Sequence, residues 1–217
     1  QTALLKNHTN YIASSEFINL SNLNTSSWTI NDNDSNVIID QVVQQGRCLN
    51  EWDLRINIGI LNGLNEAFVI DENTKNEIIE AEPKASEIIY PMLRGRDMKR
   101  YYPNFSNLYL INTYNGELVD KKDSNGKTYK VRINRVDVVK DYPEVYSHLK
   151  KFEEKARIRF NQGDHWTNLR NCAYNDDFLR PKIIYPSITK DLPFIYDENC
   201  FFTNDKSFIM SGEKLKY

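Results

Sequence analysis

The chain has 217 residues with an apolar share of 40%, which is enough to bury a core in one large domain. It starts at Gln1 with no apolar run long enough for a signal peptide or a membrane span, so we expect a piece of a longer polypeptide with no membrane partner. Its three cysteines are odd in number and far apart. They fit neither a disulfide framework nor a zinc site, and they predict a reducing, cytoplasmic compartment.

The net charge of −2 argues against a nucleic-acid binder until its distribution is considered. Residues 1–93 carry a net charge of −8, residues 94–190 carry +8 and residues 191–217 carry −2. The middle of the chain is therefore a basic block between acidic flanks. Such a block is either a solvated surface or the electrostatic footprint of a nucleic-acid binder.

The first 34 residues are polar with short apolar islands, and they predict an irregular N-terminal approach. Asp34 and Ser35 can cap a helix over Ser35–Gln45, in which apolar residues recur at helical spacing and which Gly46 ends. With no internal repeat or low-complexity linker beyond this point, residues 35–217 are treated as one domain.

The stretch Ile56–Asp71 holds two apolar, β-branched runs on either side of Asn62-Gly63-Leu64-Asn65. Because Asn-Gly between such runs is a strong hairpin signal, we expect a β-hairpin whose polar tip carries Asn62, Gly63 and Asn65. An ordinary turn placed for its backbone geometry is the alternative.

The segment Arg94–Tyr102 is the densest cationic stretch of the chain. Gly95 allows a sharp turn, and the cations and tyrosines around Asp97 suit contacts to phosphates, sugars and base edges. Alternatively, one arginine pairs with Asp97 and the other side chains cover the core with their stems.

The other elements follow from periodicity and from turn and cap signals. In chain order they are an acidic helix capped by residues 71–74 and ending before Pro83, a helical turn at 86–93, strands at 108–111 and 127–139, a helix from Pro143 to Phe160, and a strand at 182–185. A final pair of short strands follows, one at 194–196 and the other at either 201–202 or 208–210.

Asp141 and Glu153-Glu154-Lys155 imitate the carboxylate and lysine pattern of metal-dependent nucleases. In those enzymes the residues lie on adjoining strands, whereas here the Glu-x-Lys falls on the solvated face of a predicted helix. We therefore expect no metal site. A nuclease domain is kept as a rival interpretation.

Several motifs occur in an order that resembles one known family. They are Gly59-Ile60-x-Asn62-Gly63-x-Asn65-Glu66-Ala67-Phe68-x-Ile70-Asp71, Glu87-Ile88-Ile89-x-Pro91-x-Leu93-Arg94-Gly95-Arg96-Asp97-x-Lys99-Arg100-Tyr101, Tyr142-Pro143 with His148-Leu149, Leu169-Arg170-x-Cys172-Ala173-Tyr174, and Pro181-Lys182-Ile183-Ile184-Tyr185-Pro186. Together they resemble the TaqI-like C-terminal specificity domain over about residues 35–210. That domain is the target recognition domain of adenine-specific DNA methyltransferases and of fused type II restriction-modification enzymes.

The resemblance implies a mixed α+β fold, with an irregular and largely antiparallel sheet flanked by helices, that recognises double-stranded DNA in a sequence-specific way. In that family a catalytic methyltransferase domain of the same polypeptide binds S-adenosylmethionine and flips an adenine out of the stack. This chain has neither Asn-Pro-Pro-Tyr nor Asp-Pro-Pro-Tyr, and no glycine-rich cofactor fingerprint. We therefore expect no cofactor and no catalytic residue in this fragment.

The expected DNA-binding residues are the following: Arg94, Arg96, Lys99, Arg100 and Lys182 for the phosphate backbone, with Tyr101 beside them; Asn62, Gly63 and Asn65 at the predicted tip; and Arg170, Tyr174 and Tyr185. Residues that read bases vary among such domains, and we expect some of them in the lysine-rich insert Lys121–Arg135. A rival from another class is a protein-interaction module, in which the predicted hairpin and the tyrosines bind a partner subunit and the basic block is incidental.

Overall fold

The computed structural model describes residues 33–124, 126–213 and 215. The chain divides into two compact units, Gln1–Trp52 and Asp53–Tyr217, and each is described by itself. Within the described part, no helix combines the length and the apolar character that crossing a membrane requires.

In the first unit, helix α3 runs over Asn33–Gln45 and is followed by the 3-10 turn η2 at Leu49–Glu51. The predicted helix Ser35–Gln45 is confirmed, and the Gly46 N–H donates to the Val42 carbonyl oxygen at 2.7 Å. Of the segment predicted to be irregular, residues 1–34, residues 1–32 lie outside the part of the chain that the structure describes.

The second unit is a mixed α+β fold with two four-stranded sheets, which confirms the predicted fold class. One sheet is antiparallel throughout, in the order β1 (Arg55–Ile58), β12 (Ser207–Ser211), β9 (Lys182–Pro186) and β10 (Ile195–Asp197). The other has the order β11 (Phe202–Thr203), β3 (Ile89–Leu93), β6 (Leu108–Ile111) and β2 (Val69–Asp71), with β11 and β3 parallel and the remaining pairs antiparallel. The strands predicted at 108–111, at 182–185 and at 194–196 are confirmed, and both of the alternative positions for the last strand, 201–202 and 208–210, overlap strands, β11 and β12.

The core is shared by the two sheets. Phe178 and Phe202 stack with their ring centroids 4.6 Å apart, and both are fully buried. Ile184 of β9 and Leu110 of β6 are fully buried in the same cluster. One continuous apolar core therefore holds the second unit together.

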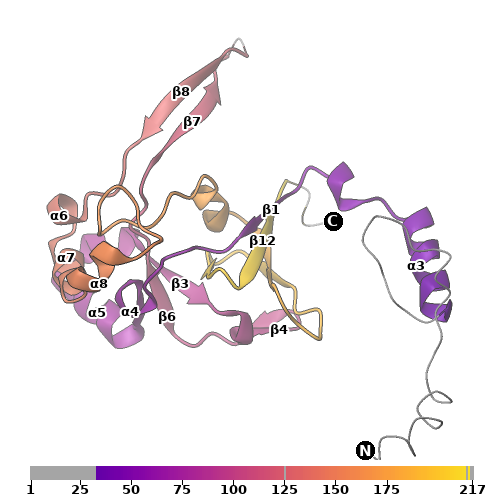
Figure 1. Cartoon of the computed structure of the whole chain (residues 1–217), viewed down its shortest axis with the longest axis horizontal. Coiled ribbons are helices and arrows are strands. Elements are labelled where there is room, and N and C mark those ends of the chain that lie inside the picture. Colours follow the sequence, from indigo (N-terminus) through magenta and orange to yellow (C-terminus); the bar gives the residue numbers. More distant parts are fainter. Residues whose placement is uncertain (1–32, 125, 214, 216–217) are drawn as a thin grey trace, which may run out of the picture. The chain divides into compact units, whose positions relative to one another are not determined.

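The α-helices of the second unit lie together at one end of it, away from β1 and β12 (Figure 1). They are α4 (Asn65–Phe68), α5 (Glu72–Ala81), α6 (Val138–Asp141), α7 (Pro143–Lys150) and α8 (Glu153–Ile158), and the 3-10 turns are η3 (Pro83–Glu87), η4 (Gly95–Asp97) and η5 (Asn175–Leu179). The predicted acidic helix is confirmed as α5. The Asp71 carboxylate caps this helix by accepting from the Thr74 N–H at 2.8 Å, as expected from the sequence.

The predicted long helix from Pro143 to Phe160 is wrong in its extent. The chain breaks between α7 and α8, and Phe160 is 96% exposed instead of continuing the apolar stripe. Beyond α8 the guanidinium of Arg159 is buried and donates to the carbonyl oxygens of Trp166, at 2.7 Å, and Asn168. These bonds hold Arg159 in an extended conformation and stop the helix.

The predicted hairpin Ile56–Asp71 is also wrong, because β1 pairs with β12 and β2 pairs with β6. The side chain of Asn62 accepts from the Leu64 N–H at 3.0 Å and donates to Oδ1 of Asn65 at 2.8 Å. Asn62 thus forms a local side-chain turn that leads into α4, and its two flanking runs belong to different sheets.

Residues 86–93, predicted as a helical turn, form the end of η3 and strand β3. Ile89, Met92 and Leu93 are buried in this strand, which lies between β11 and β6. Pairing on both sides outweighs the local apolar pattern, and Pro91 disfavours a helix there.

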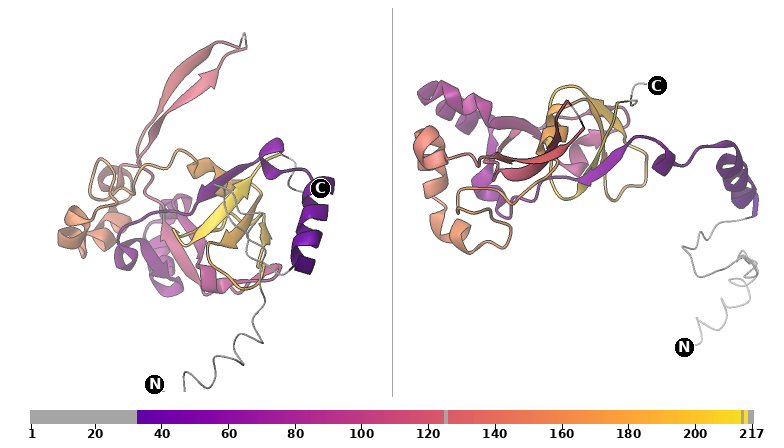
Figure 2. Two further views of the ribbon diagram at one scale, coloured as in Figure 1. Left: turned by 45° about the vertical axis from the view of Figure 1, so that its right-hand side comes forward. Right: turned by 90° about the horizontal axis from the view of Figure 1, so that it is seen from above.

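Two hairpins complete the second unit: β4 (Met98–Lys99) with β5 (Tyr102–Pro103), and β7 (Glu117–Lys122) with β8 (Thr128–Ile133). The predicted strand at 127–139 is confirmed as far as Ile133, whereas residues 138–141 form α6. Figure 2 shows the β7–β8 hairpin extending away from the rest of the second unit.

Candidate nucleic-acid interface

The turn at the start of the cationic segment is held by Arg94 and Asp97. The guanidinium of Arg94 donates through Nε to Oδ2 of Asp97 at 2.8 Å and through Nη2 to Oδ1 at 2.9 Å. Burial raises the pKa of Asp97, but the bonds from Arg94 and Ser106 outweigh it and hold that pKa below its ordinary value. Arg94 is therefore the arginine that pairs with the acid, and it braces the turn that presents the next cations.

The tip of the β4–β5 hairpin consists of Arg100 and Tyr101, because Lys99 and Tyr102 are directly paired. Tyr101 has a φ of 73°, in the left-handed region that residues other than glycine rarely adopt, and it is 71% exposed. The guanidinium carbon of Arg100 lies 5.2 Å from the centre of the Tyr101 ring. A strained, exposed tip of this kind is typical of functional surfaces and costs about 1–3 kcal/mol.

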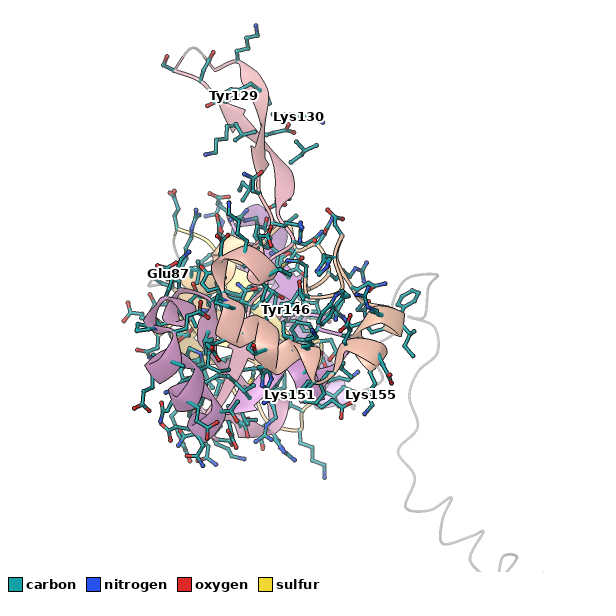
Figure 3. All side chains as sticks on the ribbon, turned by 90° about the vertical axis from the view of Figure 1, so that its left-hand side faces the viewer. Glu87, Tyr129, Lys130, Tyr146, Lys151 and Lys155 are labelled. Atoms are coloured by element: carbon teal, nitrogen blue, oxygen red, sulfur yellow. The ribbon has the colours of Figure 1, made fainter. Side chains whose placement is uncertain are left out.

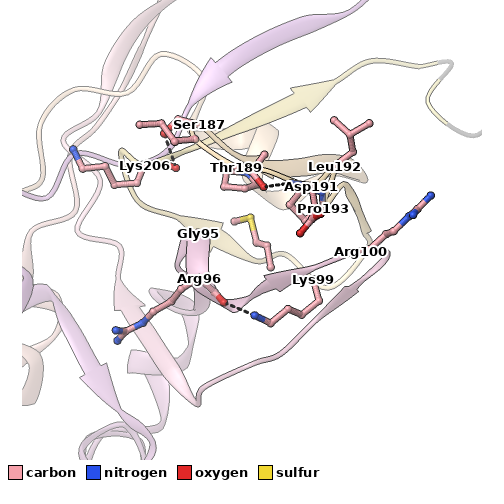
Figure 4. A pocket seen from close by; sticks show the side chains of 13 residues that line it. Gly95, Arg96, Lys99, Arg100, Ser187, Thr189, Asp191, Leu192, Pro193 and Lys206 are labelled. Carbon is pink, nitrogen blue, oxygen red and sulfur yellow. Dashed lines mark hydrogen bonds between the residues drawn. The ribbon is translucent and has the colours of Figure 1, made fainter. Parts of the chain in front are cut away.

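Arg96, Lys99 and Arg100 are all exposed, and they line one wall of a groove of about 930 Å³. Figure 4 shows the opposite wall, which is the loop after β9 and includes Ser187, Thr189, Asp191 and Leu192, with Lys206 at one end. The groove is therefore lined by four cations, Arg96, Lys99, Arg100 and Lys206, and by one carboxylate, that of Asp191. The ammonium of Lys206 also pairs with the Asp205 carboxylate at 3.3 Å. This excess of positive charge suits a polyanionic ligand.

The second wall of the groove was not identified from the sequence. Ile188 is 92% and Leu192 is 69% exposed, so two aliphatic side chains stand among the cations. Pro186 and Pro193 bracket this loop, and a polar loop carrying aliphatic residues between two prolines is the signal that could have identified it.

Lys182 was predicted to contact the phosphate backbone, and the structure corrects this. Its side chain is fully buried, and Nζ lies 2.5 Å from Oδ2 of Asp197 and 2.6 Å from the Phe178 carbonyl oxygen. Burial lowers the pKa of Lys182, and Asp197 opposes this shift. Lys182 shares the inward face of β9 with Ile184, so it is an internal ion-pair partner instead of a surface cation.

The predicted tip residues do not form one exposed group. The side chain of Asn62 is buried and bonded to its neighbours, whereas Gly63 and Asn65 are exposed beside a small polar pocket of about 210 Å³. Gly63 has a φ of 70°, so its role in the turn is backbone geometry. None of these three residues lines the cationic groove.

Arg170, Tyr174 and Tyr185 likewise lie outside the groove lining. Arg170 is exposed, with Nη1 3.5 Å from Oδ1 of Asn161. Tyr174 packs against the core, and burial raises its pKa to about 12. Tyr185 packs against Phe194 and Phe208, with ring centroids 5.0 and 5.6 Å away.

Glu153 and Lys155, which form the Glu-x-Lys part of the imitated nuclease motif, are engaged in surface ion pairs. Glu153 accepts from Nη2 of Arg157 at 2.6 Å, one helical turn along α8. Lys155 lies 2.7 Å from the Glu66 carboxylate. These pairs match the solvated helix face expected from the sequence.

No family model matches the chain. The type II methyltransferase M.MjaIV of Methanocaldococcus jannaschii is 22% identical to it over 163 residues, which are 73% of this chain and 47% of that protein. The chain thus spans about half the length of the curated relative that it matches. Among solved structures, that of the type IIL restriction-modification enzyme MmeI in complex with DNA has a TM-score of 0.49 and 12% identity over 73% of this chain and 19% of MmeI.

Proposed function

We propose that this chain is the module of a restriction-modification enzyme or adenine-specific DNA methyltransferase that recognises double-stranded DNA. The observation that carries the proposal is the groove whose lining brings Arg96, Lys99 and Arg100 together, with Asp191 as the only carboxylate among its described lining residues. Similarity to a type II methyltransferase over about half of that protein's length supports it. In this proposal S-adenosylmethionine and the catalytic residues belong to a methyltransferase domain of the same polypeptide.

In this proposal the cations that line the groove and their two neighbours outside its lining, Arg94 and Tyr101, have different roles. Arg96, Lys99 and Arg100 neutralise phosphates and release condensed counterions, which supplies affinity for any sequence. Tyr101 stands beside Arg100 with its ring exposed, where it can pack on sugar or base edges. Arg94 fixes the turn through Asp97.

The test is duplex binding by the whole chain, measured as fluorescence anisotropy on a labelled duplex of about 30 base pairs. We expect the variant Arg96→Gln, Lys99→Gln, Arg100→Gln to bind about tenfold more weakly or worse, because up to three phosphate contacts are lost. The matched control is Lys84→Gln, Lys140→Gln, Lys151→Gln, which removes the same charge from exposed positions that do not line the groove.

Equal losses in the two variants would contradict the groove as the interface, because net charge alone would then explain binding. Wild-type affinity in the groove variant would contradict it as well. Absence of duplex binding by the wild-type chain, together with capture of a protein partner at any salt concentration, would favour the interaction module instead.

A further inference from the structure

The β7–β8 hairpin is built as a projecting arm. Its six residue pairs run in register from Glu117–Ile133 to Lys122–Thr128, and its two strands pair with each other in a sheet of their own. None of its described residues belongs to the hydrophobic core. Leu118 is 60% and Tyr129 is 48% exposed, and Figure 3 shows Tyr129 and Lys130 clear of the body of the unit.

An arm of this kind contributes little to stability. A two-stranded hairpin without a packed face is marginal in water, and exposed Leu and Tyr side chains add no burial. The chain nevertheless holds the arm firmly at its root. The fully buried side chain of Asn168 donates through Nδ2 to the carbonyl oxygen of Val136 at 2.9 Å and to that of Tyr114 at 3.4 Å. Both stems are therefore tied to the body, as expected of an element that must be presented in a fixed direction.

The charge of the arm suits a nucleic acid. The hairpin segment 117–133 carries five lysines and arginines against three acidic residues. Lys121, Lys127 and Lys130 are exposed near the tip. Lys121 and Tyr129 are directly opposed and share one face, whereas Lys130 is opposed to Asp120 on the other face. The Lys121–Tyr129 face thus offers a cation and a phenol without a directly opposed carboxylate.

The dimensions of the arm select one groove. Strands of six residues are about 20 Å long, and two strands about 4.8 Å apart with their side chains are about 10–12 Å wide. The major groove of B-DNA is about 12 Å wide and admits a two-stranded ribbon, whereas the minor groove is about 6 Å wide. The arm therefore fits the major groove, where each base pair presents a distinct pattern of donors and acceptors.

We infer that the β7–β8 hairpin enters the major groove and that its Lys121–Tyr129 face contacts base edges, which makes this arm the source of sequence preference. The inference rests on the proposed function and deepens it. The cationic groove supplies affinity for any duplex, and the arm supplies discrimination between sequences. Lys130, on the other face, contacts phosphate.

The experiment compares the whole wild-type chain with three variants in selections from a library of duplexes of randomised sequence. The first variant replaces Val119–Val131 by Asn-Gly, which joins Leu118 to its register partner Arg132. The second is Lys121→Ala with Tyr129→Ala, which leaves the hairpin backbone intact. The third, Lys130→Gln, is the matched control on the opposite face.

We expect the wild-type chain to prefer some sequences over others by about 5- to 150-fold. The first two variants should bind preferred and random duplexes alike, while Lys130→Gln keeps the preference and weakens all duplexes equally. Glucosylated 5-hydroxymethylcytosine, which fills the major groove, should weaken wild-type binding at least tenfold and leave the arm-shortened chain unaffected.

Retention of sequence preference by the Lys121→Ala, Tyr129→Ala variant would overturn the inference, and so would duplex binding by the wild-type chain without any preference. In either case the proposed DNA-binding function would survive. Failure of the wild-type chain to bind any duplex would overturn both. If the shortened chain does not fold, the double alanine variant decides, because it removes no backbone bond.

Discussion

The buried pair of Lys182 and Asp197 allows a quantitative prediction of stability. Both side chains are at most 1% exposed, and the ammonium also donates to the Phe178 carbonyl oxygen. Lys182→Met keeps most of the aliphatic stem and removes the charge. The Asp197 carboxylate then stays buried with the N–H groups of Asn199 and Phe201 but without a counter-charge. Breaking a buried pair in this way costs about 3–5 kcal/mol.

Such a loss is a large share of the stability of a typical domain, which is about 5–15 kcal/mol. The assay is urea unfolding followed by circular dichroism and by tryptophan fluorescence, to which the buried Trp166 contributes. The matched control is Lys190→Met, the same chemical change at an exposed loop position, with an expected effect within about 0.5 kcal/mol. The folded fraction of Lys182→Met should bind duplex DNA as tightly as the wild-type chain.

A loss below about 1 kcal/mol in Lys182→Met would refute this reasoning, because an ammonium that is cheap to remove is not a buried ion-pair partner. Lys182 would then return to the set of possible phosphate contacts. Partial recovery in the double variant Lys182→Met, Asp197→Asn would show that the unpaired carboxylate is the origin of the cost.

Three further predictions test other parts of the fold. Asp97→Asn should lower the free energy of unfolding by about 1–3 kcal/mol and weaken duplex binding, because Arg94 loses its partner and the turn before Arg96 loosens; equal stability in urea unfolding would contradict this. Gly59→Ala should lower the free energy of unfolding by about 3 kcal/mol, because the added Cβ would lie 2.0 Å from the Asn204 carbonyl oxygen. An unchanged melting temperature would contradict that close contact. Burial lowers the pKa of His148 below 6.5, so the folded state resists protonation of this side chain. The free energy of unfolding should therefore fall as the pH drops from about 6.5 through the lower pKa of the folded state. His148→Gln should lose less stability than the wild-type chain between about pH 7.5 and 5.5, and an equal loss would exclude His148 as a cause.

Local signals in the sequence predicted the elements whose determinants are local. Asp71 caps α5 with its own side chain, and the β-branched residues Ile183 and Ile184 fall in strand β9. The prediction of a hairpin at Asn62 was wrong because the determinants of this segment are not local. The strands on either side of Asn62, β1 and β2, pair with β12 and β6, and a local sequence pattern does not indicate pairing partners so far along the chain. Tertiary pairing decided the structure there.

The sequence predicted that cations cluster at the candidate site, but it did not predict which of them are exposed and which pair with a carboxylate. Gly95, Arg96, Met98, Lys99 and Arg100 line the groove, whereas Arg94 pairs with Asp97 and Tyr101 lies outside the lining. Lys182 shares the face of β9 with Ile184, which was a readable sign that it points inward, although its partner Asp197 comes from another strand. The loop that forms the second wall and Lys206 are brought to the groove by the sheet topology, which a single sequence does not display.

The most direct test of the central claim is the salt dependence of duplex binding by the wild-type chain. Three to four phosphate contacts predict a slope of about −2.7 to −3.6 for the logarithm of the association constant against that of salt concentration, or a loss of about 40- to 150-fold between 50 and 200 mM. The slope should become shallower by about 0.9 for each phosphate-contacting cation removed from the groove. A slope near zero, or one that the Arg96→Gln, Lys99→Gln, Arg100→Gln variant leaves unchanged, would contradict the account.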